Sequence, residues 1–181
     1  HLRRRLAAEA SRHAIPWTFE IVRGLERAEE WALEAADLLV AESTARPFAR
    51  HLLLESPLRA ALEQVRRPVL FLTPGRAAAS PVMVVDDGSP GAAVTLAAAE
   101  NMAAALGGEL VVLAAGEGGA EAGRSPRPNL RVSTRRLSRA DEQGIRHGAA
   151  GCGLLVLGRA STPPVLIDAL LARPPCAMLI V

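Results

Sequence analysis

The sequence predicts an α/β protein with a doubly wound parallel sheet of the Rossmann-like type. Short apolar runs rich in Val and Leu recur along the chain, and such runs are typical of strands that are buried on both faces. Stretches of helix length, rich in Ala, Leu and Glu, separate these runs. Gly, Pro, Asp and Ser stand between the two kinds of segment, where turns are expected.

The clearest βαβ unit spans residues 81–115. Its first strand, Val82–Val85, is followed by the turn Asp86-Asp87-Gly88-Ser89-Pro90. We expect Ser89 to cap a helix whose first residue is Pro90, because Pro at that position costs no hydrogen bond. The helix continues to Leu106 and ends at Gly107-Gly108. Leu110–Leu113 is the second strand, parallel to the first through a right-handed crossover.

The segments before this unit alternate in the same way. Leu2–His13 has an amphipathic helical pattern, and Trp17–Val22 alternates as a strand does. The remaining expected elements are, in order, a helix over 26–36, a strand over 37–41, a loop over 43–56, a helix over 57–65 and a strand over 68–72. Residues 73–80 contain Pro, Gly, Ala and Ser without periodicity and predict a linker.

The segments after the unit begin with a Gly-, Pro- and Arg-rich loop over 116–128. Leu130–Leu137 alternates weakly, as an edge strand does, and the helix over 140–150 is poor because it contains Gly144 and Gly148. The last three elements are a strand over 154–157, a helix over 164–172 and a strand over 176–181.

Composition excludes several classes of function. All 21 basic residues are Arg, they are interleaved with acids, and the net charge is only +2. Together with 3% aromatic residues, this argues against nucleic-acid binding. No apolar run approaches the length of a membrane span. Cys152 and Cys176 fit neither a disulfide framework nor a metal spacing, so we expect reduced thiols in a cytoplasmic protein.

Two parts of the chain resemble each other. Residues 36–40 match 152–156, and residues 61–62 and 67–72 match 170–171 and 176–181, so helix, strand, loop, helix and strand recur in one order. Chance similarity between two αβ units is the alternative. The repeat predicts a first domain over 1–76 that keeps only the C-terminal half, a linker over 77–80 and a second domain over 81–181.

The second half resembles the universal stress protein domain. The resemblance is carried by Asp87-Gly88-Ser89 after the first strand, the Ala-rich helix with Gly107-Gly108, Gly158 after the fourth strand, and Pro174-Pro175-Cys176 before the fifth. It implies a strand order of 3-2-1-4-5 and a tandem repeat with an incomplete first copy. We therefore expect further residues ahead of His1, or pairing from elsewhere for Trp17–Val22.

The resemblance implies a cofactor crevice at Asp87, Gly88, Ser89, Gly158 and Arg159, with ATP as a disfavoured ligand. ATP-binding members of the family carry a Gly-rich loop after strand four, where backbone N–H groups approach the phosphates. Here the loop starts with Gly158, but Ser161 replaces the second Gly and Thr162-Pro163-Pro164 leads directly into the helix.

The corresponding loop of the first copy also departs from the nucleotide-binding pattern. Glu42, Ala45 and Glu55-Ser56 occupy the Gly and Gly-Ser positions there. Two carboxylates at these positions would repel a triphosphate, so this copy too is expected to bind ATP poorly.

No catalytic constellation is apparent. Asp86 and Asp87 could suggest a receiver-type magnesium site, but the chain has no Lys to complete one, and this absence also removes a Walker A motif. The expected function is that of a non-enzymatic stress-response protein with degenerate nucleotide sites. The alternatives are an ATP-binding, weakly hydrolysing protein and a regulatory domain of a larger protein.

The expected partner is the chain itself or a second copy of it. Strands 68–72 and 176–181 each close a repeat and are uniformly apolar, so their edges need a cover. An antiparallel pairing of the two edges, within one chain or in a homodimer, would supply it.

Overall fold

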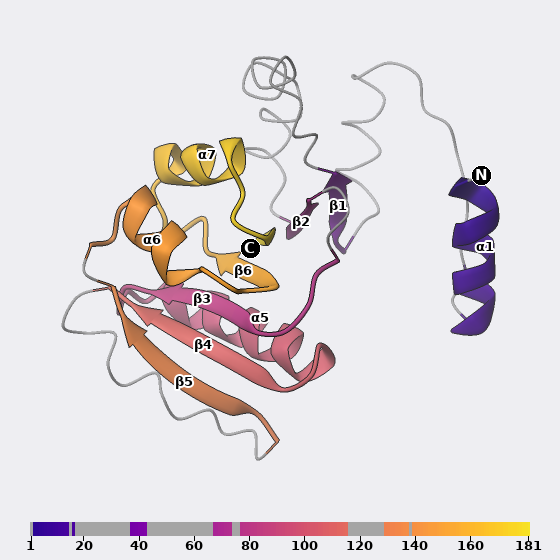
Figure 1. The fold of residues 1–181 in the computed structure, drawn as a ribbon, viewed down its shortest axis with the longest axis horizontal. Helices are drawn as coiled ribbons and strands as arrows, with labels where there is room; N and C mark the ends of the chain where they lie inside the picture. The colour runs from indigo at the N-terminus through magenta and orange to yellow at the C-terminus, as the bar shows by residue number, and fades with distance from the viewer. Residues whose placement is uncertain are drawn as a thin grey trace.

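The computed structural model describes residues 2–14, 16, 37–42, 67–73, 77–115, 129–137 and 139–181. The elements are α1 (Leu2–Arg12), β1 (Leu39–Glu42), β2 (Val69–Leu72), β3 (Val82–Asp86), α5 (Ala92–Ala105), β4 (Glu109–Ala114), β5 (Arg131–Arg136), α6 (Glu142–Gly148), β6 (Leu154–Leu157), α7 (Pro164–Ala172) and β7 (Ala177–Ile180). Figure 1 shows their arrangement, with α1 to one side of the sheet.

The seven strands form one sheet in the order β1-β2-β7-β6-β3-β4-β5. All neighbouring pairs are parallel except β2 and β7. Counted within residues 81–181, the sequence β5-β4-β3-β6-β7 is the order 3-2-1-4-5, so the predicted doubly wound topology is confirmed.

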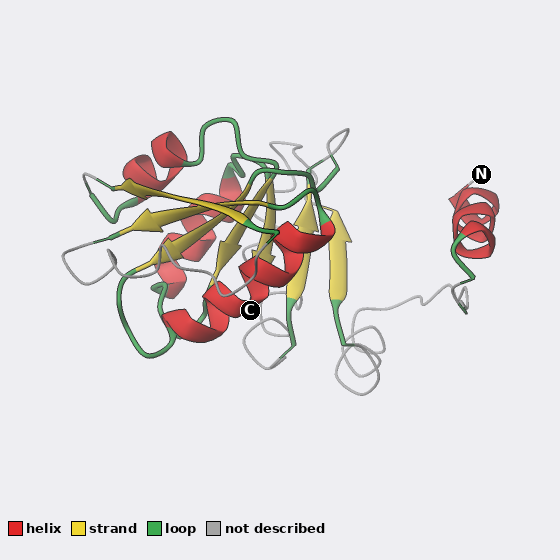
Figure 2. Ribbon diagram, turned by 90° about the horizontal axis from the view of Figure 1, so that it is seen from below, coloured by secondary structure: helices red, strands yellow, loops and turns green. Residues whose placement is uncertain are grey.

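Helices cover both faces of the sheet, and Figure 2 shows them on its two sides. On one face, Ala99 and Ala103 of α5 pack on alternate strand residues such as Val84 and Val112. On the other face, Ile145 of α6 and Leu170 of α7 pack on the intervening residues, such as Leu113 and Leu155. Small Ala side chains let α5 lie close to the strands, which is why an almost uniformly apolar helix fits there.

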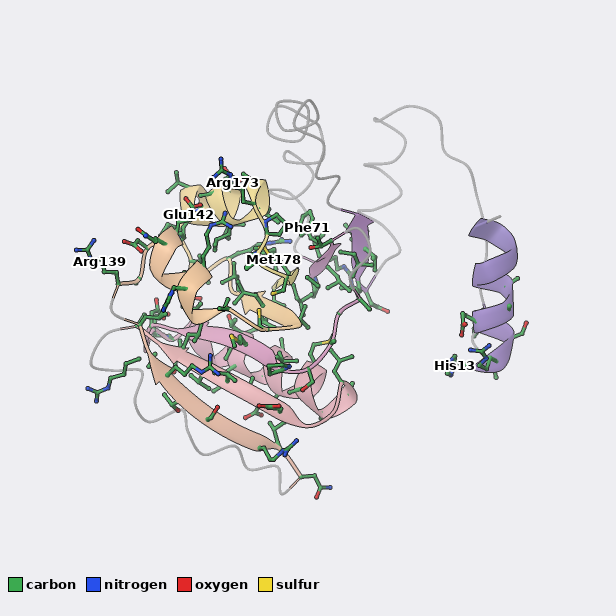
Figure 3. All side chains as sticks on the ribbon, viewed as in Figure 1. His13, Phe71, Arg139, Glu142, Arg173 and Met178 are labelled. Atoms are coloured by element: carbon green, nitrogen blue, oxygen red, sulfur yellow. The ribbon has the colours of Figure 1, made fainter. Side chains whose placement is uncertain are left out.

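The antiparallel seam between β2 and β7 joins the two halves of the chain. Val69 is opposite Ile180, Leu70 opposite Leu179, and Phe71 opposite Met178. Figure 3 shows Phe71 and Met178 beside each other at this seam. Because β1 and β2 extend the sheet across it, neither β2 nor β7 is an edge strand.

Two predictions about helix ends need comment. The Gly107-Gly108 ending is confirmed in kind, since the Gly108 N–H donates to Ala103 O at 2.7 Å and both glycines have positive φ. The start at Pro90 is wrong, because α5 begins at Ala92 with Gly91 as its N-cap residue and no capping side chain. Pro90 belongs instead to a turn that precedes the helix.

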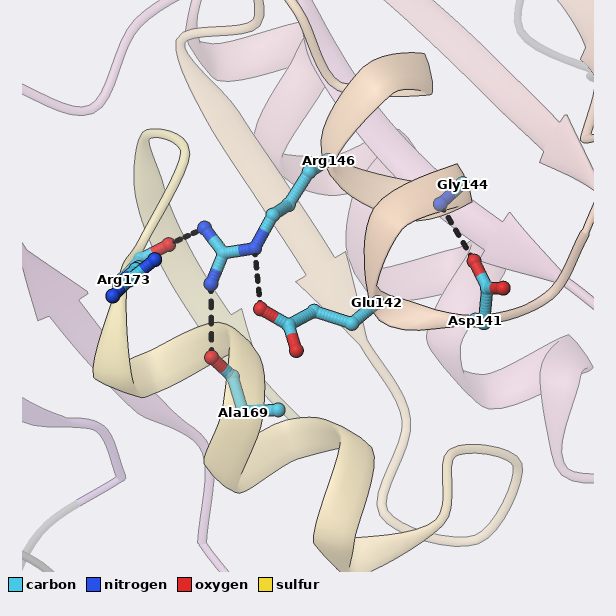
Figure 4. Close-up of polar contacts among 6 residues, drawn as sticks. All are labelled: Asp141, Glu142, Gly144, Arg146, Ala169 and Arg173. Atoms are coloured by element: carbon cyan, nitrogen blue, oxygen red, sulfur yellow. Dashed lines mark hydrogen bonds and ion pairs between the residues drawn. The ribbon is translucent and has the colours of Figure 1, made fainter.

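The two glycines of helix α6 lie where the backbone packs closely against neighbouring residues. A Cβ at Gly144 would overlap the carbonyl oxygen of Arg139, and one at Gly148 would lie 2.9 Å from the side chain of Leu137. The Gly144 N–H also donates to Asp141 Oδ1 at 2.7 Å, which caps the helix (Figure 4). The residues that weaken the helical pattern are therefore those that let this short helix sit against its neighbours.

Several expected segments lie outside the described residues: the strand over 17–22, the helices over 26–36 and 57–65, the loops over 43–56 and 116–128, and part of the linker, 74–76. Among the helices that the structure describes, none is both long and apolar enough to cross a bilayer.

Candidate functional site

The candidate site lies where β3 and β6 end side by side. These neighbouring parallel strands continue into helices on opposite faces of the sheet, α5 after β3 and α7 after β6. In open α/β sheets such a switch point is where ligands bind. Two loops meet here, residues 87–91 after β3 and residues 158–163 after β6.

The first loop is held by its two aspartates. Asp86 is 7% exposed, and its Oδ1 accepts a hydrogen bond from the Gly88 N–H at 2.9 Å. Asp87 Oδ1 accepts one from the Ser89 N–H at 3.0 Å. Gly88 has φ +74°, which a residue with a Cβ rarely adopts. Both carboxylates therefore serve the turn itself, and they occupy N–H groups that an anion would otherwise use.

Ser89 does not cap the helix with its side chain. Its Oγ is buried and has no hydrogen-bond partner, while its carbonyl oxygen accepts the Ala92 N–H at 3.0 Å. The expectation of a Ser cap is wrong because Pro90 and Gly91 place one more turn between Ser89 and α5.

The second loop uses its own N–H groups internally. The N–H groups of Ser161 and Thr162 donate to Gly158 O at 3.3 and 2.8 Å, and that of Arg159 donates to Val181 O at 2.8 Å. Pro163 and Pro164 follow and have no N–H to offer. The phosphate cradle that a glycine-rich loop would provide is thus replaced by a self-bonded turn.

The two loops pack directly on each other. Gly158 is buried, and a Cβ there would overlap Thr95 Oγ1 and lie 2.6 Å from Ser161 Oγ. A Cβ at Gly91 would lie 3.0 Å from the Cβ of Ala160. Thr95 is 1% exposed, so the side chain of α5 that contacts Gly158 is itself buried.

Arg159 reaches away from this switch point, across β7. Its guanidinium Nη2 donates to Arg67 O at 2.8 Å, and Arg67 lies two residues before β2. Burial lowers the pKa of Arg159 from its ordinary value, but an arginine remains charged at neutral pH. Its cation therefore binds the seam between the halves and holds the second loop to it.

Of the residues predicted for the site, the structure brings Gly158 close to the loop that contains Asp87, Gly88 and Ser89. The contacts between the two sides involve Gly91, the last residue of that loop, and Thr95 of α5. It turns the side chain of Arg159 toward Arg67 instead. Sequence reasoning did not single out Thr95, although a lone Thr in an Ala-rich helix one turn after Gly91 is a usable signal. Thr95 Oγ1 also donates to Gly91 O at 3.4 Å.

The positions proposed for the first copy are only partly covered. Glu42 is the last residue of β1, and Ala45, Glu55 and Ser56 lie outside the described residues. Within the described ranges no three His, Cys, Asp or Glu side chains gather as a metal site would require.

A separate open cavity of about 600 Å³ lies between α6 and α7. Its lining includes Asp141, Glu142 and Gln143 at the start of α6, together with Arg146 and Arg173. The Arg146 guanidinium is already hydrogen-bonded within the protein, because it donates to Glu142 Oε1 at 2.8 Å, to Ala169 O at 2.9 Å and to Arg173 O (Figure 4). This cavity is thus lined by groups that hold two helices together.

Comparisons with known proteins place the fold. No protein-family model matches the sequence, and no curated protein matches it. A universal stress protein from Archaeoglobus fulgidus matches with a TM-score of 0.64 and 14% identity, over 92% of this chain and 67% of that one. A putative universal stress protein from Pseudomonas aeruginosa UCBPP-PA14 matches with a TM-score of 0.69 and 15% identity, over 99% of this chain and 77% of that one.

A third solved structure, of a functionally unknown protein from Pseudomonas aeruginosa PAO1, matches with a TM-score of 0.67 and 14% identity. That match extends over 99% of this chain and 76% of the other chain. The sheet order, the helices on both faces and these three likenesses agree, so the chain has the universal stress protein fold.

Proposed function

We propose that this chain is a non-enzymatic, cytoplasmic stress-response protein whose nucleotide crevice is degenerate. The fold shared with two structures described as universal stress or putative universal stress proteins supports the stress role. The self-bonded loops at the switch point support the loss of nucleotide binding. We infer that the protein acts through its surfaces rather than by chemistry on a bound nucleotide.

The proposal depends most on the backbone N–H groups after β6, because several of them already donate hydrogen bonds within the protein. A triphosphate is held by several N–H groups aimed at one point, with a helix N-terminus behind them. Here three of those groups bond to Gly158 O or Val181 O, and the next two residues are Pro163 and Pro164. Opening the turn to bind phosphate would break its internal hydrogen bonds and still leave the two prolines without donors.

The charges at the switch point also disfavour ATP binding. Asp86 and Asp87 stand at the end of β3, on the other side of the switch point, and no Lys exists in the chain to offset them. Arg159, the basic residue of the second loop, is engaged with Arg67 O. For an anion at this switch point, the two loops and the end of β3 thus provide two carboxylates and one arginine whose guanidinium is bound elsewhere.

Calorimetric titration of the full chain with ATP and Mg²⁺ tests the proposal. We expect no saturable heat at micromolar ligand, because three N–H groups of the loop after β6 are engaged and its two prolines have none. A dissociation constant near or below micromolar, which corresponds to about −8 kcal/mol of binding free energy, would overturn it. A phosphate-release assay on the same samples should show no ATP hydrolysis above buffer.

A matched pair of variants tests the reason given. Replacing Pro163 with Gly and Pro164 with Ala restores two backbone donors, and we expect ATP affinity to rise about tenfold, or 1.4 kcal/mol. Pro174→Ala, a Pro substitution before β7 and away from this loop, should leave ATP affinity unchanged. An equal effect of both changes would contradict the explanation.

The stress role needs a cellular test. Deletion of the gene from its source organism should lower survival after heat, starvation or peroxide, and the wild-type chain should restore survival. If survival is unchanged under all three stresses, the stress role is refuted while the conclusion about ATP stands.

A further inference from the structure

The two cysteines of the chain precede two neighbouring strands. Cys152 lies two residues before β6 and Cys176 one residue before β7, and these strands are parallel with Leu154 opposite Ala177. Parallel strands lie about 4.8 Å apart and advance about 3.3 Å per residue. An offset of one residue across that gap gives a Cα separation of roughly 6 Å, within the range that disulfides span.

Their side chains already meet. Both side chains contact the same apolar cluster, which contains Cys176 and has Cys152 packed against it. A side-chain hydrogen bond with Cys176 lowers the pKa of Cys152 below its ordinary value, although burial opposes the shift. A thiolate is the nucleophilic form of cysteine. Cys152 is therefore the candidate nucleophile of the pair, and Cys176 lies beside it at the start of the neighbouring strand.

Access differs between the two sulfurs. Cys152 is partly exposed, whereas Cys176 is 2% exposed. An oxidant from solvent reaches Cys152 first, and Cys176 is then the nearest thiol.

The backbone around the pair is fixed by three contacts. The Cys152 N–H donates to Ala149 O at 3.0 Å, and the Gly153 N–H donates to Pro81 O at 3.0 Å. Thr73 Oγ1 donates to Cys176 O at 3.2 Å. The residues just before β3, the start of β6, the start of β7 and the residue after β2 thus converge at the cysteines, where the two halves of the chain meet.

We propose that Cys152 and Cys176 form a reversible thiol–disulfide couple, closed by an oxidant of the peroxide class. The Cys152 thiolate attacks the O–O bond of hydrogen peroxide, giving a sulfenic acid at Cys152 and, with a proton, one water. The Cys176 sulfur then attacks the sulfenic sulfur, the S–S bond forms and a second water leaves. Two thiols lose two electrons, and one peroxide becomes two waters.

The disulfide would tie the starts of β6 and β7 beside the seam with β2. A cross-link restricts the unfolded chain more than the folded one. The oxidised protein should therefore melt at a higher temperature than the reduced protein. The couple does not depend on nucleotide binding, so it can fail while the proposed function stands.

The test uses the wild-type full chain treated with hydrogen peroxide, then denatured without reductant. We expect the count of free thiols to fall from two to zero, the intact mass to fall by the mass of two hydrogens and the protein to remain monomeric on a non-reducing gel. Trypsin should release peptide 147–159 linked to peptide 160–181, because the Arg173–Pro174 bond resists cleavage. Dithiothreitol should restore both thiols and the melting temperature.

Two single substitutions separate the roles. In Cys176→Ser, peroxide should leave a sulfenic acid on Cys152 that dimedone traps. In Cys152→Ser, Cys176 should react at least tenfold more slowly than Cys152 does in the wild type, because it is buried. Retention of both free thiols in the wild type, a cross-link between two chains, or equal reaction rates in the two variants would overturn the proposal.

Discussion

At the scale of single residues, the glycine at position 158 can be explained either by phosphate binding or by packing. The sequence pattern assigns it to a phosphate-binding loop, whereas in the structure its hydrogen occupies the place where a Cβ would overlap Thr95 Oγ1. The glycine is thus required by contact between the loop after β6 and helix α5. Neither reading could be chosen from the sequence, because the partner, Thr95, is 63 residues away along the chain.

Gly158→Ala should lower the free energy of unfolding by roughly 1–3 kcal/mol, since it overfills a packed site. Thr95→Ala removes the hydroxyl that the new methyl group meets, so the double variant should recover part of the loss. Urea denaturation of the four proteins measures the coupling. Strict additivity of the two single changes would contradict this packing explanation.

At the scale of elements, α6 and α7 depend on one arginine. Arg146 donates from α6 to Ala169 O on α7 and to Arg173 O just after it, while Glu142 holds its Nε. A planar guanidinium serves these acceptors from three separate nitrogens in a fixed fork, whereas a Lys ammonium offers its donors from one nitrogen.

Arg146→Lys should therefore destabilise the protein by roughly 1.5–3 kcal/mol, the scale of a hydrogen bond to a charged group. Arg139→Lys, an exposed change just before α6, is the matched control and should be neutral. Thermal melting compares the two variants, and equal melting temperatures would show that the arginine fork is not needed.

Most elements of the second half could be predicted from the sequence because each depends on local patterns. The strand 154–157 and the helix 164–172 coincide with β6 and α7, and Val82–Val85 extends by one residue in β3. The predicted start of α5 at Pro90 is wrong, because Pro90 and Gly91 form a turn that precedes the helix.

The candidate site was harder to predict than the fold. Turn residues can be located along the chain, but the use of their N–H groups depends on contacts that only the folded sheet creates, such as Arg159 with Val181 O. The same holds for the cysteines. Their spacing of 24 residues matches no motif, and only the parallel register of β6 and β7 makes them neighbours.

At the scale of the whole molecule, the halves share one sheet through β2 and β7. Leu179 is 4% exposed at that seam, opposite Leu70. An unpaired charge placed there would have to be buried or would separate the strands.

Leu70→Lys and Leu179→Lys should each lower the melting temperature without changing the monomer mass in light scattering. Val94→Lys, at a position 69% exposed on α5, is the matched control and should have little effect. If either seam variant instead halves the mass of a wild-type dimer, the apolar strands are shared between two chains. No effect from either would refute a buried seam.

The seam also bears on how such a chain tolerates divergence. The strands join there through backbone N–H and C=O groups, which nearly every residue possesses. The pairing therefore depends little on which apolar side chains are present. Exchanges between aliphatic residues leave this backbone pairing in place. The sequences of the two halves can then change while the sheet that unites them stays the same, and solved structures of similar fold have only 14–15% identity to this chain.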